Sequence, residues 1–177
     1  MLLFISLFIV FTLIIFRRKK FILKRLERGE FIQGDIINEH LKVISSVGEG
    51  GFGKVYKCID QNLEGKIVAV KLIKPDHVES YSRNELQVLA QLNHANIGSI
   101  IGFGETEQRL PYLTMDYVEG RTLSDIVQTF REKNKILTSN LIIYIIFEVS
   151  KALKHASEKN VFHRDICPSN IMIKKDE

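Results

Sequence analysis

The chain has 177 residues, of which 45% are hydrophobic and 26% are charged, with two cysteines and three prolines. This ordinary globular composition argues against a disordered chain, a collagen-like repeat and a disulfide-rich scaffold. The net charge of +4 comes from one block, residues 17–28, which holds seven basic residues against one acidic residue. From residue 29 onward the chain is net acidic, so no nucleic-acid partner is expected.

Residues 1–16 form an apolar run without a charged side chain. As a helix this run would span ~24 Å, slightly less than a ~30 Å hydrocarbon core, and the residues after it could supply the difference. The alternative is a cleaved signal peptide, which requires a positive n-region and a small-residue cleavage site that the sequence does not show. We therefore expect a transmembrane helix at 1–16. The positive-inside rule then predicts a single-pass membrane protein whose remaining residues are cytoplasmic.

The basic, glycine-punctuated stretch 17–40 is expected to be a connector, with the folded part beginning near Leu41. Beyond it, short segments rich in Val and Ile lie between turn residues and predict strands. The strands are expected at 41–47, 54–59, 67–73, 100–104 and 112–118, with an amphipathic helix at 80–92. From 119 the pattern is helical to about 159. The apolar run 141–147 indicates a helix that a complete domain would bury on every face.

A glycine-rich segment follows the first predicted strand. Gly48, Gly50 and Gly53 have the spacing G-x-G-x-x-G, which three unrelated folds use to bring backbone N–H groups close to phosphate. A dinucleotide-binding fold requires a helix after the third glycine, and a Walker A loop requires Ser or Thr where Val55 stands. The residues after Gly53 alternate as in a strand. The segment therefore predicts a turn between two antiparallel strands that covers a nucleotide.

This interpretation predicts a lysine in the next strand and an acidic partner on the following helix, because an ammonium group near phosphates needs a counter-charge. Lys71, in Val-Ala-Val-Lys, and Glu85 meet both expectations, although each alone would be an ordinary solvated residue. Farther along, Asp165 ends a His-Arg-Asp tripeptide and Asn170 follows at the spacing H-R-D-x-x-x-x-N.

With these motifs in order, the sequence resembles the protein kinases, and in particular the bacterial eukaryotic-like (Hanks-type) serine/threonine kinases. The His-Ala-Asn-Ile segment 94–97 and the hinge-like segment 115–118 also stand in the family's order. The resemblance implies an α+β protein kinase-like fold. It places an antiparallel five-stranded small lobe with one helix at 41–118, and part of a helical large lobe at 119–177.

The resemblance also implies ATP and Mg²⁺ as cofactors and gives roles to the matching residues. Asp165 would orient the acceptor hydroxyl and take its proton, and Asn170 would bind a metal ion. Lys71, paired with Glu85, would hold the α and β phosphates. The remaining implied contacts are the three glycines on the phosphates, Val47, Val55, Ala69 and Met172 on the faces of the adenine, Met115 behind it, and Asp116 and Val118 at its edge.

The sequence departs from the family pattern in two places. Cys167 stands where serine/threonine kinases usually have a lysine that contacts the transferred phosphate, and a neutral thiol cannot supply that charge. The sequence ends at Glu177 without D-F-G, activation segment or A-P-E, and the D-F-G aspartate is a principal Mg²⁺ ligand. We therefore expect this chain alone to have no substantial kinase activity.

Three interpretations stay open, and none of them identifies the protein substrate. The chain is a fragment or truncated form of a membrane-anchored serine/threonine kinase, a membrane-tethered pseudokinase-like module that binds nucleotide or a partner, or half of a split enzyme that another chain completes. In each case the run 141–147 is expected to expose an apolar patch that promotes association.

Overall fold

The computed structural model describes residues 2–51, 53–74 and 90–175, with side chains from residue 15 onward. The predicted helix at 80–92 lies almost entirely outside these residues. The chain separates into two compact units. One comprises Met1–Lys66, Val70–Val78 and Gly104–Tyr112, and the other comprises Ile67–Ala69, Glu79–Phe103 and Leu113–Glu177.

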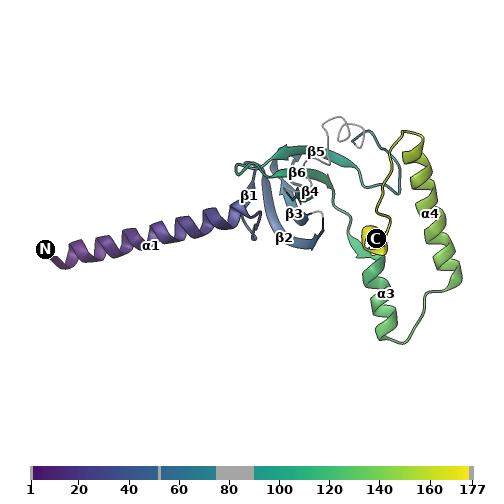
Figure 1. The fold of residues 1–177 in the computed structure, drawn as a ribbon, viewed down its shortest axis with the longest axis horizontal. Helices are drawn as coiled ribbons and strands as arrows, with labels where there is room; N and C mark the ends of the chain where they lie inside the picture. Colours follow the sequence, from purple (N-terminus) through teal and green to yellow (C-terminus); the bar gives the residue numbers. More distant parts are fainter. Residues whose placement is uncertain (1, 52, 75–89, 176–177) are drawn as a thin grey trace. The chain divides into compact units, whose positions relative to one another are not determined.

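Helix α1 runs Leu2–Glu27, so it continues through most of the basic block that we expected in a connector (Figure 1). Neither Gly nor Pro interrupts this range, and Leu, Arg and Lys favour the helix. The helix ends in a Schellman motif: Gly29 has a φ of 66°, and its N–H donates to the Leu26 carbonyl (2.9 Å). The Glu30 N–H donates to the Arg25 carbonyl (3.1 Å).

The predicted transmembrane helix finds no support in the structure. Among the residues that the structure describes, none of the helices combines the length and the apolarity that crossing a bilayer requires.

The larger sheet has six strands in the order β1-β2-β3-β4-β6-β5 (Figure 1). The strands are β1 Ile36–Ile37, β2 Leu41–Gly50, β3 Gly53–Asp60, β4 Lys66–Ile73, β5 Ile100–Glu105 and β6 Pro111–Asp116, with a short 3₁₀ turn, η1, at Gln61–Leu63. The five predicted strands are present, and β1 is an additional strand that the sequence did not indicate. Both β1 with β2 and β2 with β3 pair antiparallel.

The packed part of the chain begins before Leu41. Phe31 is 7% exposed and Ile37 is 1% exposed, so both belong to the apolar core that also holds Leu41 and Cys58. Burial raises the pKa of the Cys58 thiol to about 12, and the negative charge of Asp60 adds to the shift. The segment between α1 and β2 is therefore part of the folded body and not a solvated connector.

The C-terminal part contains helices and a second, two-stranded sheet. Its elements are β7 Gly120–Thr122, α3 Leu123–Glu132, α4 Ser139–Ser157, η3 Pro168–Asn170 and β8 Met172–Lys174. The Thr122 and Thr138 hydroxyls accept N–H bonds that cap α3 and α4. β7 pairs antiparallel with β8, and the approach is close: a Cβ at Gly120 would lie 2.2 Å from the Ile173 carbonyl oxygen.

Helix α4 carries the apolar run that we expected a complete domain to bury. Ala152 and Ala156 are its buried residues. In its first half Ile145 is only partly exposed, whereas six other large apolar side chains are 41–64% exposed: Leu141, Ile142, Ile143, Tyr144, Ile146 and Phe147. We call these six residues the α4 patch, and its exposure confirms the expectation for this chain.

Candidate functional site

The glycine-rich segment forms the turn of an antiparallel hairpin. β2 and β3 pair so that Gly48 lies opposite Val55 and Gly50 lies opposite Gly53. Because a strand directly follows Gly53, the helix required by a dinucleotide fold or a Walker A loop is replaced by β3. The predicted arrangement of the turn is confirmed.

The glycines of this hairpin differ in how much space lies beside their Cα atoms. A Cβ on Gly48, Gly50 or Gly51 would meet nothing within 4 Å, so their backbone has open space beside it. Gly53 has a φ of 148°, and a Cβ there would lie 1.7 Å from the Leu72 carbonyl oxygen. The first three positions can therefore receive a ligand close to the backbone, whereas Gly53 is also required by the packing of β3 on β4.

Side chains next to the turn hold its two arms. The Lys74 Nζ donates to the Gly50 carbonyl (3.1 Å), and the Lys54 Nζ lies 3.7 Å from the Glu49 carboxylate. Val47, which lies in an irregularity of the β2–β3 register, is 52% exposed, and Val55 is half-buried. Sequence reasoning did not find Lys74, because a single lysine after a strand carries no pattern.

The predicted phosphate-binding lysine lies in β4. Val68, Ala69 and Val70 before it and Leu72 after it are buried, whereas Lys71 is partly exposed. The close approach of Gly53 to Leu72 brings the glycine turn beside this part of β4. Glu85, its predicted partner, lies outside the described residues, so their pairing stays a prediction.

The second group of candidate residues is the loop before η3. The Asn170 Nδ2 donates to the Asp165 carboxylate (2.9 Å) and to the Asp165 backbone carbonyl (3.0 Å). The Asp165 N–H donates to the His163 Nδ1 (3.3 Å), and the Asn170 N–H donates to the Cys167 carbonyl (2.9 Å). The structure therefore brings the predicted base and the predicted metal ligand together in one hydrogen-bonded loop.

The predicted hinge residues lie at and after the end of β6. Met115 and Asp116 are partly exposed, and the Asp116 N–H donates to the Ser99 carbonyl (3.0 Å). Val118 lies in the segment that leads to β7. In the smaller sheet Thr122 of β7 lies opposite Met172 of β8, which is 42% exposed. One compact unit thus contains the hinge-like segment, Met172 and the Asp165 loop.

The position that departs from the family pattern also has a partner. The Cys167 Sγ lies 3.1 Å from the Ser169 Oγ. Cys167 directly precedes η3, and Ser169 and Asn170 are its last two residues. Spacing alone could not predict this contact, because it depends on the 3₁₀ turn η3. The neighbourhood of Asp165 thus contains a thiol and a hydroxyl where a cation was expected.

The donor atoms of this loop suit Mg²⁺. Asn170 keeps an amide oxygen and Asp165 has a carboxylate, and hard oxygen ligands are those that Mg²⁺ prefers. Within the described ranges, the side chains form no cluster of three or more His, Cys, Asp or Glu residues that could hold a metal alone. A Mg²⁺ ion bound through one or two protein oxygens together with substrate phosphates fits this arrangement.

Comparison with known proteins gives one family. The protein kinase domain family matches residues 41–177. Among solved structures, the kinase domain of PknI from Mycobacterium tuberculosis superposes with a TM-score of 0.70 at 24% identity, covering 81% of this chain and 58% of that chain. At this identity the likeness establishes the fold.

Curated relatives agree with the family. A probable serine/threonine-protein kinase of Clostridium perfringens is 32% identical over 148 residues, which cover 81% of this chain. The serine/threonine-protein kinase PknB of Mycolicibacterium smegmatis is 36% identical over 138 residues, which cover 73%. The chain spans 21% of the length of each of these relatives. The match over residues 41–177, together with the hairpin and the Asp165 loop, shows that the chain belongs to the protein kinase family.

Proposed function

We propose that this chain binds ATP with Mg²⁺ and contains the nucleotide-binding hairpin and catalytic loop of a kinase that phosphorylates serine or threonine in proteins. The observation that carries the proposal is the pair of hydrogen bonds from Asn170 to Asp165, which orients a carboxylate beside a candidate metal ligand. The names of the curated relatives support the serine/threonine class. The protein substrate stays unidentified.

Each candidate residue has a defined task in this proposal. Asp165 orients the acceptor hydroxyl and accepts its proton, while Asn170 fixes the Asp165 carboxylate and offers its own oxygen to the metal. When bound, Mg²⁺ neutralises charge on the phosphates. Lys71 contributes a positive charge to the α and β phosphates, and the open backbone at Gly48 and Gly50 provides N–H groups to them.

A second candidate function is nucleotide binding without phosphoryl transfer. It is favoured by Cys167, which stands where the family pattern has a cation for the transferred phosphate. The Cys167 thiol is instead hydrogen-bonded to the Ser169 hydroxyl. Such a chain would act as a pseudokinase-like binding module. Completion by another chain that supplies the remaining large lobe would instead restore transfer.

Membrane attachment through the N-terminal helix also remains a proposal. Its support is the uncharged run 1–16 followed directly by the basic block, and with it the body would lie on the cytoplasmic side.

The proposal is tested by titrating the full chain with ATP in the presence and absence of Mg²⁺. We expect saturable binding that requires Mg²⁺ and that Lys71→Ala weakens about tenfold or more, the cost of one lost charge-assisted contact. Lys66→Ala is the matched control, since Lys66 is an exposed lysine at the start of the same strand. Absence of ATP binding in the unmodified chain would refute the proposal.

The two candidate functions are separated by measuring phosphate transfer to the chain itself or to a general protein acceptor. Transfer that Asp165→Asn abolishes while ATP binding persists identifies a kinase. If transfer is absent in the unmodified chain but appears in Cys167→Lys, the thiol is the reason for the inactivity. ATP binding without transfer in both forms, and still without transfer when the remaining large lobe is supplied on a second chain, identifies a binding module.

A further inference from the structure

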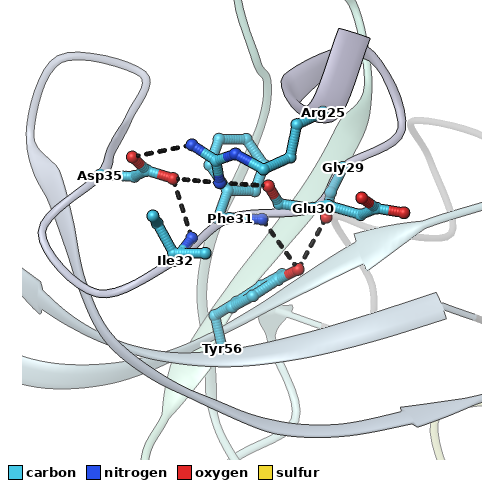
Figure 2. Close-up of polar contacts among 7 residues, drawn as sticks. All are labelled: Arg25, Gly29, Glu30, Phe31, Ile32, Asp35 and Tyr56. Atoms are coloured by element: carbon cyan, nitrogen blue, oxygen red, sulfur yellow. Dashed lines mark hydrogen bonds and ion pairs between the residues drawn. The ribbon is translucent and has the colours of Figure 1, made fainter. Parts of the chain in front are cut away.

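One arginine of the basic block faces the folded body. The other six basic residues of the block are exposed, whereas the Arg25 side chain is 13% exposed. Its guanidinium donates to both carboxylate oxygens of Asp35, at 2.7 and 3.2 Å, and also to the Glu30 carbonyl (Figure 2). A bidentate pair of this kind fixes orientation as well as distance. It fastens the last turn of α1 to the segment that precedes β1.

The same segment is held on β3 by a buried tyrosine. The Tyr56 hydroxyl accepts the Phe31 N–H (3.1 Å) and donates to the Gly29 carbonyl (2.7 Å), as Figure 2 shows. The Tyr56 and Phe31 rings meet edge to face with centroids 5.7 Å apart, and Tyr56 is 2% exposed. We call Arg25, Gly29, Phe31, Asp35 and Tyr56 the linker clamp.

The position of Tyr56 relates the linker clamp to the glycine turn. Successive side chains of a strand lie on opposite faces, so Tyr56 and Lys54 share one face of β3 and Val55, opposite Gly48, lies on the other. The Lys54 Nζ is 3.8 Å from the Glu30 carboxylate and 3.7 Å from that of Glu49, its cross-strand neighbour. The segment between α1 and β1 therefore contacts Lys54 of β3 through Glu30, and Lys54 in turn contacts Glu49 of β2, on the face of β3 opposite to Val55.

We propose that the linker clamp is a positioning device that orders the glycine hairpin for nucleotide, so that the state of α1 sets the nucleotide affinity. The proposal rests on the proposed ATP binding by this hairpin. The physical basis is that apparent affinity falls in proportion to the fraction of molecules whose binding segment is in the competent arrangement. Any event that pulls or reorients the end of α1 would act on the hairpin through Arg25 and Tyr56.

The test compares two neighbouring charge removals in the full chain. Arg25→Gln breaks the linker clamp, and Lys24→Gln removes the same charge from an exposed position of the same helix turn. We expect Arg25→Gln to speed amide hydrogen exchange in residues 28–37 and also in 46–56, and to raise the dissociation constant for ATP about three- to tenfold. Lys24→Gln should change neither quantity.

A second variant guards against a general loss of folding. Tyr56→Phe keeps the buried ring and removes only its two hydrogen bonds, and circular dichroism with urea titration identifies conditions in which each variant is fully folded. If the linker clamp only stabilises the fold, both variants should bind ATP with the affinity of the unmodified chain under those conditions. The proposal is overturned if exchange rises in 28–37 alone while 46–56 and the ATP affinity stay unchanged.

Failure of ATP binding and failure of the positioning role give different experimental results. If the unmodified chain binds no ATP, the proposed function fails, and the hydrogen exchange of residues 46–56 alone decides whether the linker clamp orders the hairpin. If ATP binds and Arg25→Gln and Tyr56→Phe leave both exchange and affinity of the hairpin at the unmodified values, the proposed function stands and the positioning role is refuted.

Discussion

At the scale of single residues, Asp35 makes stability depend on pH. Burial would raise the pKa of its carboxyl group, but the hydrogen bond from Arg25, the Ile32 N–H and the charge of Arg25 together lower it below the ordinary value of 3.8. A group whose pKa is lower in the folded state stabilises the protein above its unfolded pKa. This contribution disappears as the pH falls through the folded value.

We therefore expect the urea midpoint of the chain to fall as the pH is lowered from about 6 to about 3, with the contribution of Asp35 lost below its ordinary pKa. Asp35→Asn should be less stable at the upper end and should show a shallower decline. The measurement is a series of urea titrations of both proteins. Parallel curves would show that the Arg25 pair does not stabilise the fold.

Single residues also show where sequence reasoning ends. Gly53 was predicted from the spacing of the glycine motif, and its positive φ and its contact with Leu72 explain why glycine stands there. The hydrogen-bond partners of the Tyr56 hydroxyl, Phe31 and Gly29, are by contrast 25 and 27 residues away in sequence. No periodicity marks such a pair, because a tyrosine in a strand is equally compatible with simple core packing.

At the scale of elements, the glycine hairpin allows a clean comparison. Gly53→Ala forces a side chain into the Leu72 carbonyl at a φ that L-residues avoid, so we expect a loss of about 2 kcal/mol or more in the free energy of unfolding. Gly50→Ala has open space and should stay within about 0.5 kcal/mol. Urea denaturation of the full chain measures both, and equal losses would contradict the close approach of β3 to β4.

The strands that the sequence predicted are those with enough residues to form a recognisable run. Segments of five to seven residues, rich in Val and Ile and bounded by turn residues, indicated the five long strands, whereas β1, β7 and β8 have two or three residues each and form no such run. The basic block was assigned to a connector from its charge. It is helical because its residues favour helix up to Gly29, where the chain turns.

At the scale of the whole molecule, the α4 patch predicts self-association. Six large apolar side chains exposed on one short stretch exceed what isolated surface residues provide. We expect the sedimentation coefficient of the full chain to rise with protein concentration. Ile143→Glu combined with Ile146→Glu should weaken this association about tenfold or more.

Ser150→Glu is the control for the α4 patch, because it adds negative charge at an exposed polar position of the same helix. The control should associate as the unmodified chain does. If all variants sediment identically, the α4 patch takes no part in association.

The fold class could be predicted from the sequence because several motifs of moderate specificity stand in a fixed order. The joint match of these motifs said more about the fold class than any single predicted helix or strand. The same order of motifs selected Asp165 and Asn170 as candidate site residues, and the structure shows a hydrogen bond between them, while their roles stay predictions. Spacing could not predict the contact of Arg25 with Asp35, which requires the chain to turn after α1, or the contact of Cys167 with Ser169, which depends on the local geometry at η3.

The burial of Cys58 has a practical consequence for experiments on this protein. With a pKa of about 12 and no exposed surface, its thiol has almost no thiolate at neutral pH and is shielded from reagents. Cys167, which is partly exposed, lies two residues from Asp165. In the folded chain, maleimide dyes or spin labels should therefore react with Cys167 alone. A label at Cys167 would lie within the candidate catalytic loop, so no engineered cysteine is needed to place a probe there.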